Sequence, residues 1–137
     1  MRCRIAPCMS VLAGVVAALA PAGPLRAEEG SDRAAYNNHC RQCHSTRPGD
    51  NRLGPSMHGM FGAEAGAVKD FKGYSGSLAG FTWDQTTLDR FIADPVAFAT
   101  NTNMITPPVG DPGERRKIIA FLKSISELSS PSPPDRK

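Results

Sequence analysis

Two cysteines separated by two residues, Cys40 and Cys43, constrain this chain more than any other feature of its sequence. In an oxidising compartment such a pair can form a disulfide, or it can act as a thioredoxin-like redox pair because the spacing lowers a thiol pKa. The next residue, His44, completes the pattern C-x-x-C-H, the signature of covalent haem attachment. Two thiols in a short turn can add to the vinyl groups on one porphyrin edge while the imidazole points at the iron. The motif therefore predicts one haem c, with Cys40 and Cys43 as tethers and His44 as the proximal ligand.

Zinc is a competing interpretation, because cysteine and histidine are also zinc ligands. A closed structural zinc site needs four ligands, and the chain has only three histidines, His39, His44 and His58. The other two cysteines, Cys3 and Cys8, lie in an N-terminal segment that we expect to be removed. Haem therefore explains the motif better than zinc, and a haem-free thiol protein is the third hypothesis.

The N-terminal segment has the features of a secretory signal peptide. Two arginines give a positive start, residues 9–20 form an apolar run without charge, and small residues follow up to Ala27. A membrane span needs roughly 20 apolar residues, and Pro21 interrupts this run earlier. A retained anchor is the alternative. We therefore assign residues 1–27 to a signal peptide cleaved after Ala27, and expect a periplasmic protein.

The charge of the chain argues against nucleic acid or an anionic membrane surface as a partner. The whole chain has a formal charge of +3, but Arg2, Arg4 and Arg26 lie in the expected signal peptide and no acidic residue does. The remainder has 13 basic and 13 acidic residues. A neutral domain lacks the excess of positive charge on which binding to polyanions depends.

Beyond the signal peptide the sequence predicts helices and no convincing strand. Ser31 or Asp32 can cap a helix that runs to about Arg41, with the cysteines at its end and in the following turn. Residues 45–80 are rich in glycine and have few apolar clusters, so we expect a loop with at most one short helix. A loop this long in a small domain needs something to organise it, and a buried macrocycle would do so.

A second helix is expected after this loop. Thr82 and Gln85 resemble a capping box, and the helix must stop before Pro95 because proline disfavours helical backbone at the preceding residue. Its apolar residues are Leu88, Phe91 and Ile92.

The clearest helix signal lies near the C-terminus. Asp111 is a capping residue, Pro112 stands at the first helical position and Glu114 completes the start signal. Apolar residues then recur every three or four positions. They are Ile118, Phe121, Leu122, Ile125 and Leu128. Residues 129–137 are rich in serine and proline and predict a disordered tail, which leaves residues 28–128 as one domain.

Haem iron needs a sixth ligand or an open position. Met104 follows His44 by 60 residues and stands in a polar loop with little apolar company, which favours a ligand over a core residue. The rivals are Met57, Met60 and His58, or an open site. A thioether with an imidazole favours electron transfer.

Longer segments of the chain are similar to one known family. They include residues 54–62, the pair Asp94 and Pro95, and residues 102–104. From Glu29 to Ser124 the chain resembles the mitochondrial-type class I cytochromes c and their bacterial relatives. The resemblance implies an all-α cytochrome c fold, a small helical domain wrapped around one covalently attached haem.

The resemblance also implies roles for individual residues. The carbonyl of Pro55 would accept a hydrogen bond from the proximal imidazole, and Tyr74 and Trp83 would hydrogen-bond a haem propionate. Arg115 and Phe121 match the C-terminal helix of the family, which crosses the N-terminal helix near the position of Tyr36. Met104 matches the distal ligand.

The implied function is an electron carrier, not an enzyme. It would shuttle one electron between respiratory or photosynthetic redox proteins, with membrane-bound complexes as donor and acceptor, and it would be a monomer. The alternative is a haem enzyme, or a gas or redox sensor, with a displaceable distal ligand. The loop around Met104 offers no obvious distal acid or base for such an enzyme.

Several positions depart from the family pattern. A glycine of the N-terminal helix is Asp32 here, an arginine that contacts a propionate is Ala63, and a tyrosine near the distal sulfur is Phe91. Only Arg52 remains of the family's lysine ring, so we expect a small apolar partner contact around Val96 and Ala97. The other ring positions are His39, Asn103, Gly110 and Asp111.

Overall fold

The computed structural model describes residues 25–75, 78 and 80–129 of the chain. Within these residues four helices follow in order, and no strand forms beyond an isolated bridge between Glu64 and Thr82. The helices are α1 (Leu25–His39), α2 (Gln85–Ala93), α3 (Pro95–Phe98) and α4 (Pro112–Ser129). The expected all-α fold is confirmed. None of the helices among these residues is long and apolar enough to cross a membrane.

Helix α1 begins earlier than the sequence predicts. The prediction of a cap at Ser31 or Asp32 is wrong, because both residues lie inside the helix. Ser31 fits there because its hydroxyl donates to the carbonyl of Glu28 at 2.8 Å. The helix ends at His39, two residues before the expected Arg41, and leads directly into the turn that carries the cysteines. The expected cleavage point after Ala27 lies within α1 and stays a prediction.

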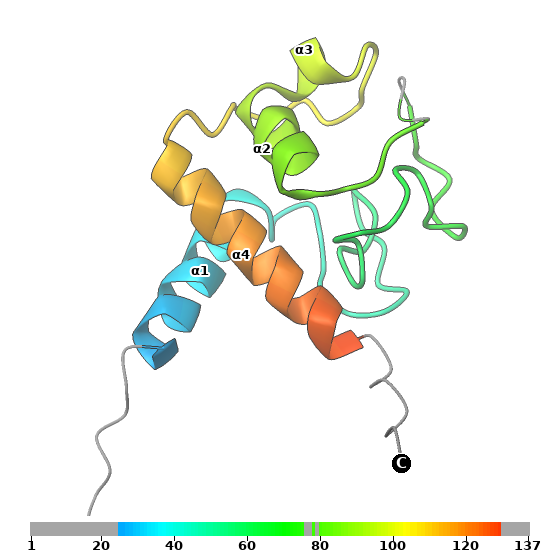
Figure 1. The fold of residues 1–137 in the computed structure, drawn as a ribbon. Coiled ribbons are helices and arrows are strands. Elements are labelled where there is room, and N and C mark those ends of the chain that lie inside the picture. The colour runs from blue at the N-terminus through cyan, green and yellow to red at the C-terminus, as the bar shows by residue number, and fades with distance from the viewer. Residues whose placement is uncertain (1–24, 76–77, 79, 130–137) are drawn as a thin grey trace, which may run out of the picture.

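Helices α1 and α4 cross and pack against each other, as Figure 1 shows in blue and orange. Their contact is built on Tyr36 and Phe121, whose ring centroids lie 4.9 Å apart. Ala35 and Leu122 are almost fully buried beside them. The aspartate at position 32 therefore does not prevent the terminal helices from packing one turn later.

Helix α2 is capped two residues later than expected. Asp84, not Thr82, is the N-cap: its carboxylate accepts a hydrogen bond from the backbone of Thr87 at 2.7 Å, and the Thr87 hydroxyl accepts one from the backbone of Asp84 at 2.9 Å. Thr82 takes part through its carbonyl, which accepts bonds from the Thr87 hydroxyl and from the backbone N–H of Asp84. The expected stop before Pro95 is confirmed.

Helix α3 is a short turn that the sequence does not predict. Asp94 ends α2 by donating its backbone N–H to Arg90, and its side chain accepts a bond from Ala97 at 3.0 Å to start α3. Pro95 occupies the first helical position. One aspartate and one proline therefore turn the chain into the loop that carries Met104.

Helix α4 starts as predicted, at Pro112, with the Asp111 carboxylate accepting bonds from the backbone of Gly113 and Glu114. Ile118, Phe121 and Leu122 are buried and Ile125 partly so. Leu128 is a wrong core prediction, because 86% of it is exposed at the last turn. Ser129 belongs to the helix and not to the tail, while residues 130–137 lie outside the described residues.

The segment between α1 and α2 has no helix in its described part, as expected, and is held by scattered hydrogen bonds. The backbones of Gly62 and Trp83 pair at 2.7 Å, and those of Trp83 and Ala63 at 2.9 Å. The N–H of Phe61 donates to the hydroxyl of Ser126 on α4 at 3.1 Å. These bonds fix the segment as a wall facing α2 and α4 (Figure 1).

Candidate haem-binding site

A mostly apolar cavity of about 570 Å³ lies between the loop segment, the Met104 loop, α2 and α4. All seven predicted site residues line it. They are Cys40, Cys43, His44, Pro55, Tyr74, Trp83 and Met104. The first and the last of them, Cys40 and Met104, are more than 60 positions apart in the sequence. The fold therefore brings distant candidate residues together at one cavity.

His44 is held in one orientation within this cavity. Its Nδ1 lies 2.8 Å from the carbonyl oxygen of Pro55. Because a carbonyl only accepts, Nδ1 carries the proton and Nε2 keeps its lone pair. Burial lowers the pKa of His44, although the bond to Pro55 opposes this shift, so the ring stays neutral. A neutral imidazole with a fixed tautomer is the form that binds a metal.

Gly54 is a site residue that the sequence analysis missed. A Cβ at this position would clash with the imidazole of His44 on three of its ring atoms. Only glycine lets the backbone approach the ring this closely. The signal in the sequence is its place directly before Pro55.

Cys40 and Cys43 are both free thiols, so the disulfide alternative is not realised in this structure. Cys40 is buried, and burial, followed by the charge of Cys43, raises its pKa to about 12. A thioredoxin-like pair requires a lowered thiol pKa. The environment of Cys40 therefore opposes the redox-thiol interpretation, and both cysteines line the same cavity as His44.

The donor set of the cavity does not suit zinc. Among the described residues, no group of three or more His, Cys, Asp and Glu side chains could hold a metal ion. The apolar lining instead fits a large flat ligand, with two thiols and one neutral imidazole at its wall. These residues fit a covalently attached haem.

Tyr74 and Trp83 lie on another wall of the cavity. The hydroxyl of Tyr74 accepts a bond from the backbone N–H of Val68 at 3.3 Å and keeps its own proton for a second partner. Trp83 is buried against Phe81 and Phe91, with both ring centroids 5.0 Å away. Their hydrogen bonds to a haem propionate stay a prediction.

The rivals of Met104 also line the cavity, so lining alone does not choose the distal ligand. Met57 donates its backbone N–H to the carbonyl of Ser45 at 2.7 Å, which ties its segment to the residue after His44. The ring of His58 lies 3.3 Å from the hydroxyl of Ser129, at the end of α4. Met104 comes from the separate loop that follows α3.

Two exposed apolar residues at the edge of the cavity were not predicted. Leu53 and Ile105 both line the cavity, and their exposed fractions are 81% and 82%, respectively. Val96 is also exposed but does not line the cavity. Large exposed apolar side chains next to a binding cavity mark a contact surface.

Comparison with known proteins is consistent with this site. No protein-family model matches the chain. It is 38% identical over 88 residues to cytochrome c2 iso-2 of Magnetospirillum fulvum, covering 63% of this chain and 91% of that protein. It is 33% identical to cytochrome c2 iso-2 of Magnetospirillum molischianum, covering 69% of this chain and 99% of that protein.

A solved structure gives the same result. Cytochrome cH from Methylobacterium extorquens superposes with a TM-score of 0.63 at 35% identity, covering 70% of this chain and 97% of that one. Identity of this level over nearly the whole length of the relatives shows common descent and a common fold. The chain therefore belongs to the class I cytochrome c family, whose members carry a covalently attached c-type haem.

Proposed function

We propose that this protein is a one-electron carrier, not an enzyme, in which Cys40 and Cys43 tether the haem and His44 and Met104 ligate its iron. The observation that carries the proposal is the orientation of His44: its Nδ1 is engaged by Pro55, which leaves Nε2 for the metal. The bound haem supplies a one-electron couple. The residues of the chain hold this group and orient its ligands.

The protein holds the site rigid, so that little moves when an electron arrives. Gly54 and Pro55 fix the imidazole from two directions, and burial keeps it neutral. Leu88, Ile118 and Leu122 line the cavity and are almost fully buried. A dry, close-packed wall resists rearrangement and excludes water from the iron ligands.

Met104 is the proposed distal ligand because it reaches the cavity from a segment independent of the proximal side. Met57 and Met60 follow Pro55 within five residues, on the segment that anchors His44. The loop of Met104 is anchored separately, by the backbone N–H of Asn103 bonding to the hydroxyl of Ser75 at 2.6 Å. A soft thioether paired with an imidazole favours electron transfer.

The proposed partners are a donor and an acceptor redox protein of a respiratory or photosynthetic chain, in membrane-bound complexes. Leu53 and Ile105 supply an apolar rim through which a monomer could contact either partner. We place the protein in the periplasm, exported by a signal peptide over residues 1–27.

The test is retention of haem by the polypeptide. Haem should remain with the purified chain after acid-acetone extraction and in denaturing electrophoresis, and the pyridine haemochrome spectrum should be that of a c-type haem. Cys40→Ser or Cys43→Ser should leave a single, weaker attachment. Loss of all haem from the wild-type chain in both treatments contradicts the proposal.

A further inference from the structure

A second cleft, of about 390 Å³, is lined by residues of α1, α4 and the loop after the cysteines, and it shares His44 with the main cavity. Four arginines line it. They are Arg33, Arg41, Arg47 and Arg52. Neutral donors join them at Asn37, Ser45 and Thr46, and no carboxylate of the described residues lines the cleft.

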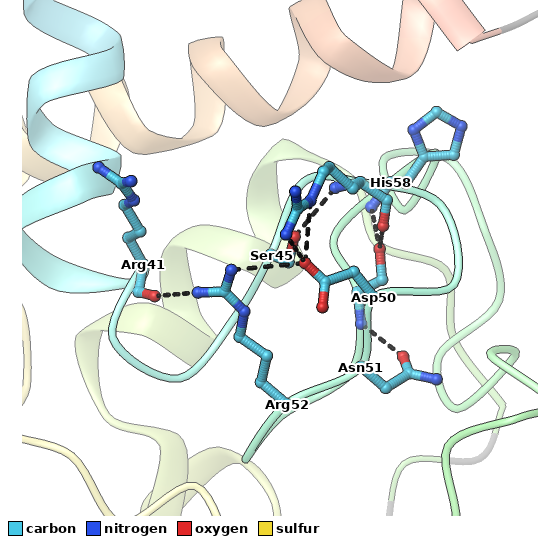
Figure 2. A network of polar contacts seen from close by, with 8 residues as sticks. Arg41, Ser45, Asp50, Asn51, Arg52 and His58 are labelled. Atoms are coloured by element: carbon cyan, nitrogen blue, oxygen red, sulfur yellow. Dashed lines mark hydrogen bonds and ion pairs between the residues drawn. The ribbon is translucent and has the colours of Figure 1, made fainter.

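One carboxylate outside the lining orients two of these arginines. Asp50 accepts bonds from Arg47 at 2.8 and 3.1 Å and lies 3.4 Å from Arg52. Arg52 also donates to the carbonyl of Arg41 at 3.4 Å, and Figure 2 shows Arg52 reaching between Arg41 and Asp50. Asp50 therefore opposes part of the positive charge of Arg47 and Arg52 and partly fixes these two guanidinium groups before any ligand arrives.

One residue of the cleft lining carries an unsatisfied polar atom. Tyr36 lines the cleft and is 3% exposed, and its hydroxyl is the buried side-chain atom without a hydrogen-bond partner among the described residues. Buried hydroxyls are nearly always paired, so this one calls for an acceptor in the cleft. Phe121 and Ile125 form the apolar side.

We propose that this cleft binds a phosphorylated small molecule through its phosphate oxygens. Guanidinium groups match phosphate geometry with paired N–H donors, and the carboxylate that bonds two of them, Asp50, does not itself line the cleft. The volume exceeds the need of a single phosphate and falls within the range of small-molecule pockets. The hydroxyl of Tyr36 gains an acceptor when an anion or its bound water fills the cleft.

His44 lines both the cleft and the haem cavity, so a bound anion lies close to the proximal ligand. Negative charge there favours the more positive ferric state. The cleft therefore binds the anion more tightly in oxidised than in reduced protein, and by reciprocity the anion lowers the redox potential. This coupling rests on the proposed function, whereas binding itself does not.

The test is calorimetric titration of the oxidised holoprotein with pyrophosphate, at an ionic strength held constant with chloride. One saturable site per chain is expected. Arg33→Gln should weaken it at least about tenfold, since a hydrogen bond to a charged group is worth that much. The control is Arg90→Gln: Arg33 and Arg90 each lie over an aromatic ring, at 5.7 and 5.2 Å, but only Arg33 lines the cleft.

Asp50→Asn keeps an acceptor near Arg47 and removes the opposing charge, so it should tighten pyrophosphate binding, an effect that misfolding cannot mimic. Non-saturable binding, or equal loss in the Arg33 and Arg90 variants, overturns the site. Equal affinity in oxidised and reduced protein overturns the coupling. A failure of the proposed haem ligation would appear separately, in the optical spectrum before any anion is added.

Discussion

At the scale of single residues, the imidazole of His44 is positioned by neighbours that act on different parts of the ring. Gly54 lets the backbone lie against the ring face, and the carbonyl of Pro55 fixes the proton on Nδ1. Packing sets where the ring lies, and the hydrogen bond sets how it is rotated and which nitrogen is available. Neither neighbour needs to touch the metal to control it.

Gly54→Ala tests the packing part of this arrangement. The added methyl group must displace the imidazole, so we expect a shifted or partly lost low-spin spectrum and a free energy of unfolding lower by about 1–3 kcal/mol. The control is Gly110→Ala, because nothing lies within 4 Å of a Cβ there. Equal denaturation midpoints and spectra in the two variants would contradict the role of Gly54.

Met104→Ala tests the distal ligand. We expect a high-spin spectrum and a lower midpoint potential, because a thioether stabilises ferrous iron. Met57→Ala and Met60→Ala are matched controls, since both side chains line the same cavity on the proximal segment. A spectrum that changes in one of these two variants and not in Met104→Ala would assign the distal ligand to that methionine instead.

At the scale of elements, the helix starts show what the sequence can and cannot predict. The start of α4 is correctly predicted because Asp111 as the cap and Pro112 at the first helical position indicate the same starting residue. The cap of α2 is misplaced because Thr82 and Asp84 are both good capping residues two positions apart. Helix α3 has four residues, too few for any periodic signal.

Site residues could be predicted where the chemistry of the site fixes their spacing in the sequence. They could not be predicted where only the folded chain brings them together. The C-x-x-C-H motif and the resemblance place seven residues that all line one cavity. The rim formed by Leu53 and Ile105 and the cleft containing Arg33 and Arg47 depend on contacts between distant segments. No local pattern in the sequence encodes them.

Ser126→Ala tests how α4 holds the long loop segment. The Ser126 hydroxyl accepts a bond from the N–H of Phe61, 65 residues away in sequence, and donates to the carbonyl of Leu122. The variant leaves the N–H of Phe61 without this acceptor, which should lower the free energy of unfolding by about 1–3 kcal/mol. We expect chemical denaturation of the holoprotein to show this loss.

Ser124→Ala is the control, because Ser124 is exposed and, among the described residues, its hydroxyl donates to the carbonyl of Phe121 on α4 and not to the loop. It should change stability by less than about 0.5 kcal/mol. If the two serine variants lose the same stability, the bond to Phe61 contributes nothing.

At the scale of the whole molecule, acid should weaken the fold through carboxylates held ionised. Bonds from Ser45 and Arg47 lower the pKa of Asp50 from its ordinary 3.8 to about 2. Capping bonds also lower the pKa values of Asp84 and Asp111. A lowered pKa contributes stability above the ordinary value, and this contribution is lost as pH falls through the folded value.

The stability difference between the wild-type protein and Asp50→Asn should therefore depend on pH. It should be largest above about pH 4 and shrink toward pH 2, where Asp50 is protonated in both the folded and the unfolded chain. Urea midpoints of the holoprotein at several pH values measure it. A difference that stays constant over this pH range would contradict the linkage.

The surface of the molecule determines where redox partners dock, and two exposed apolar surfaces are candidates for this contact. The apolar rim of Leu53 and Ile105 adjoins the haem cavity, whereas the expected contact around Val96 and Ala97 lies on α3, away from the cavity lining. Electron transfer slows steeply with distance, so a partner gains most by docking at the rim. An uncharged contact is also insensitive to salt.

We therefore expect Ile105→Lys to slow electron transfer with the natural partner more than Val96→Lys, in stopped-flow measurements over a range of salt concentrations. The two variants add the same charge at exposed positions, so they differ only in where on the surface the charge lies. A larger effect of Val96→Lys would centre the contact on α3. A wild-type rate that falls steeply with salt would instead place the partner on the arginine cleft, where Arg33, Arg41 and Arg47 give a basic face that the balance of 13 basic and 13 acidic residues after residue 27 conceals.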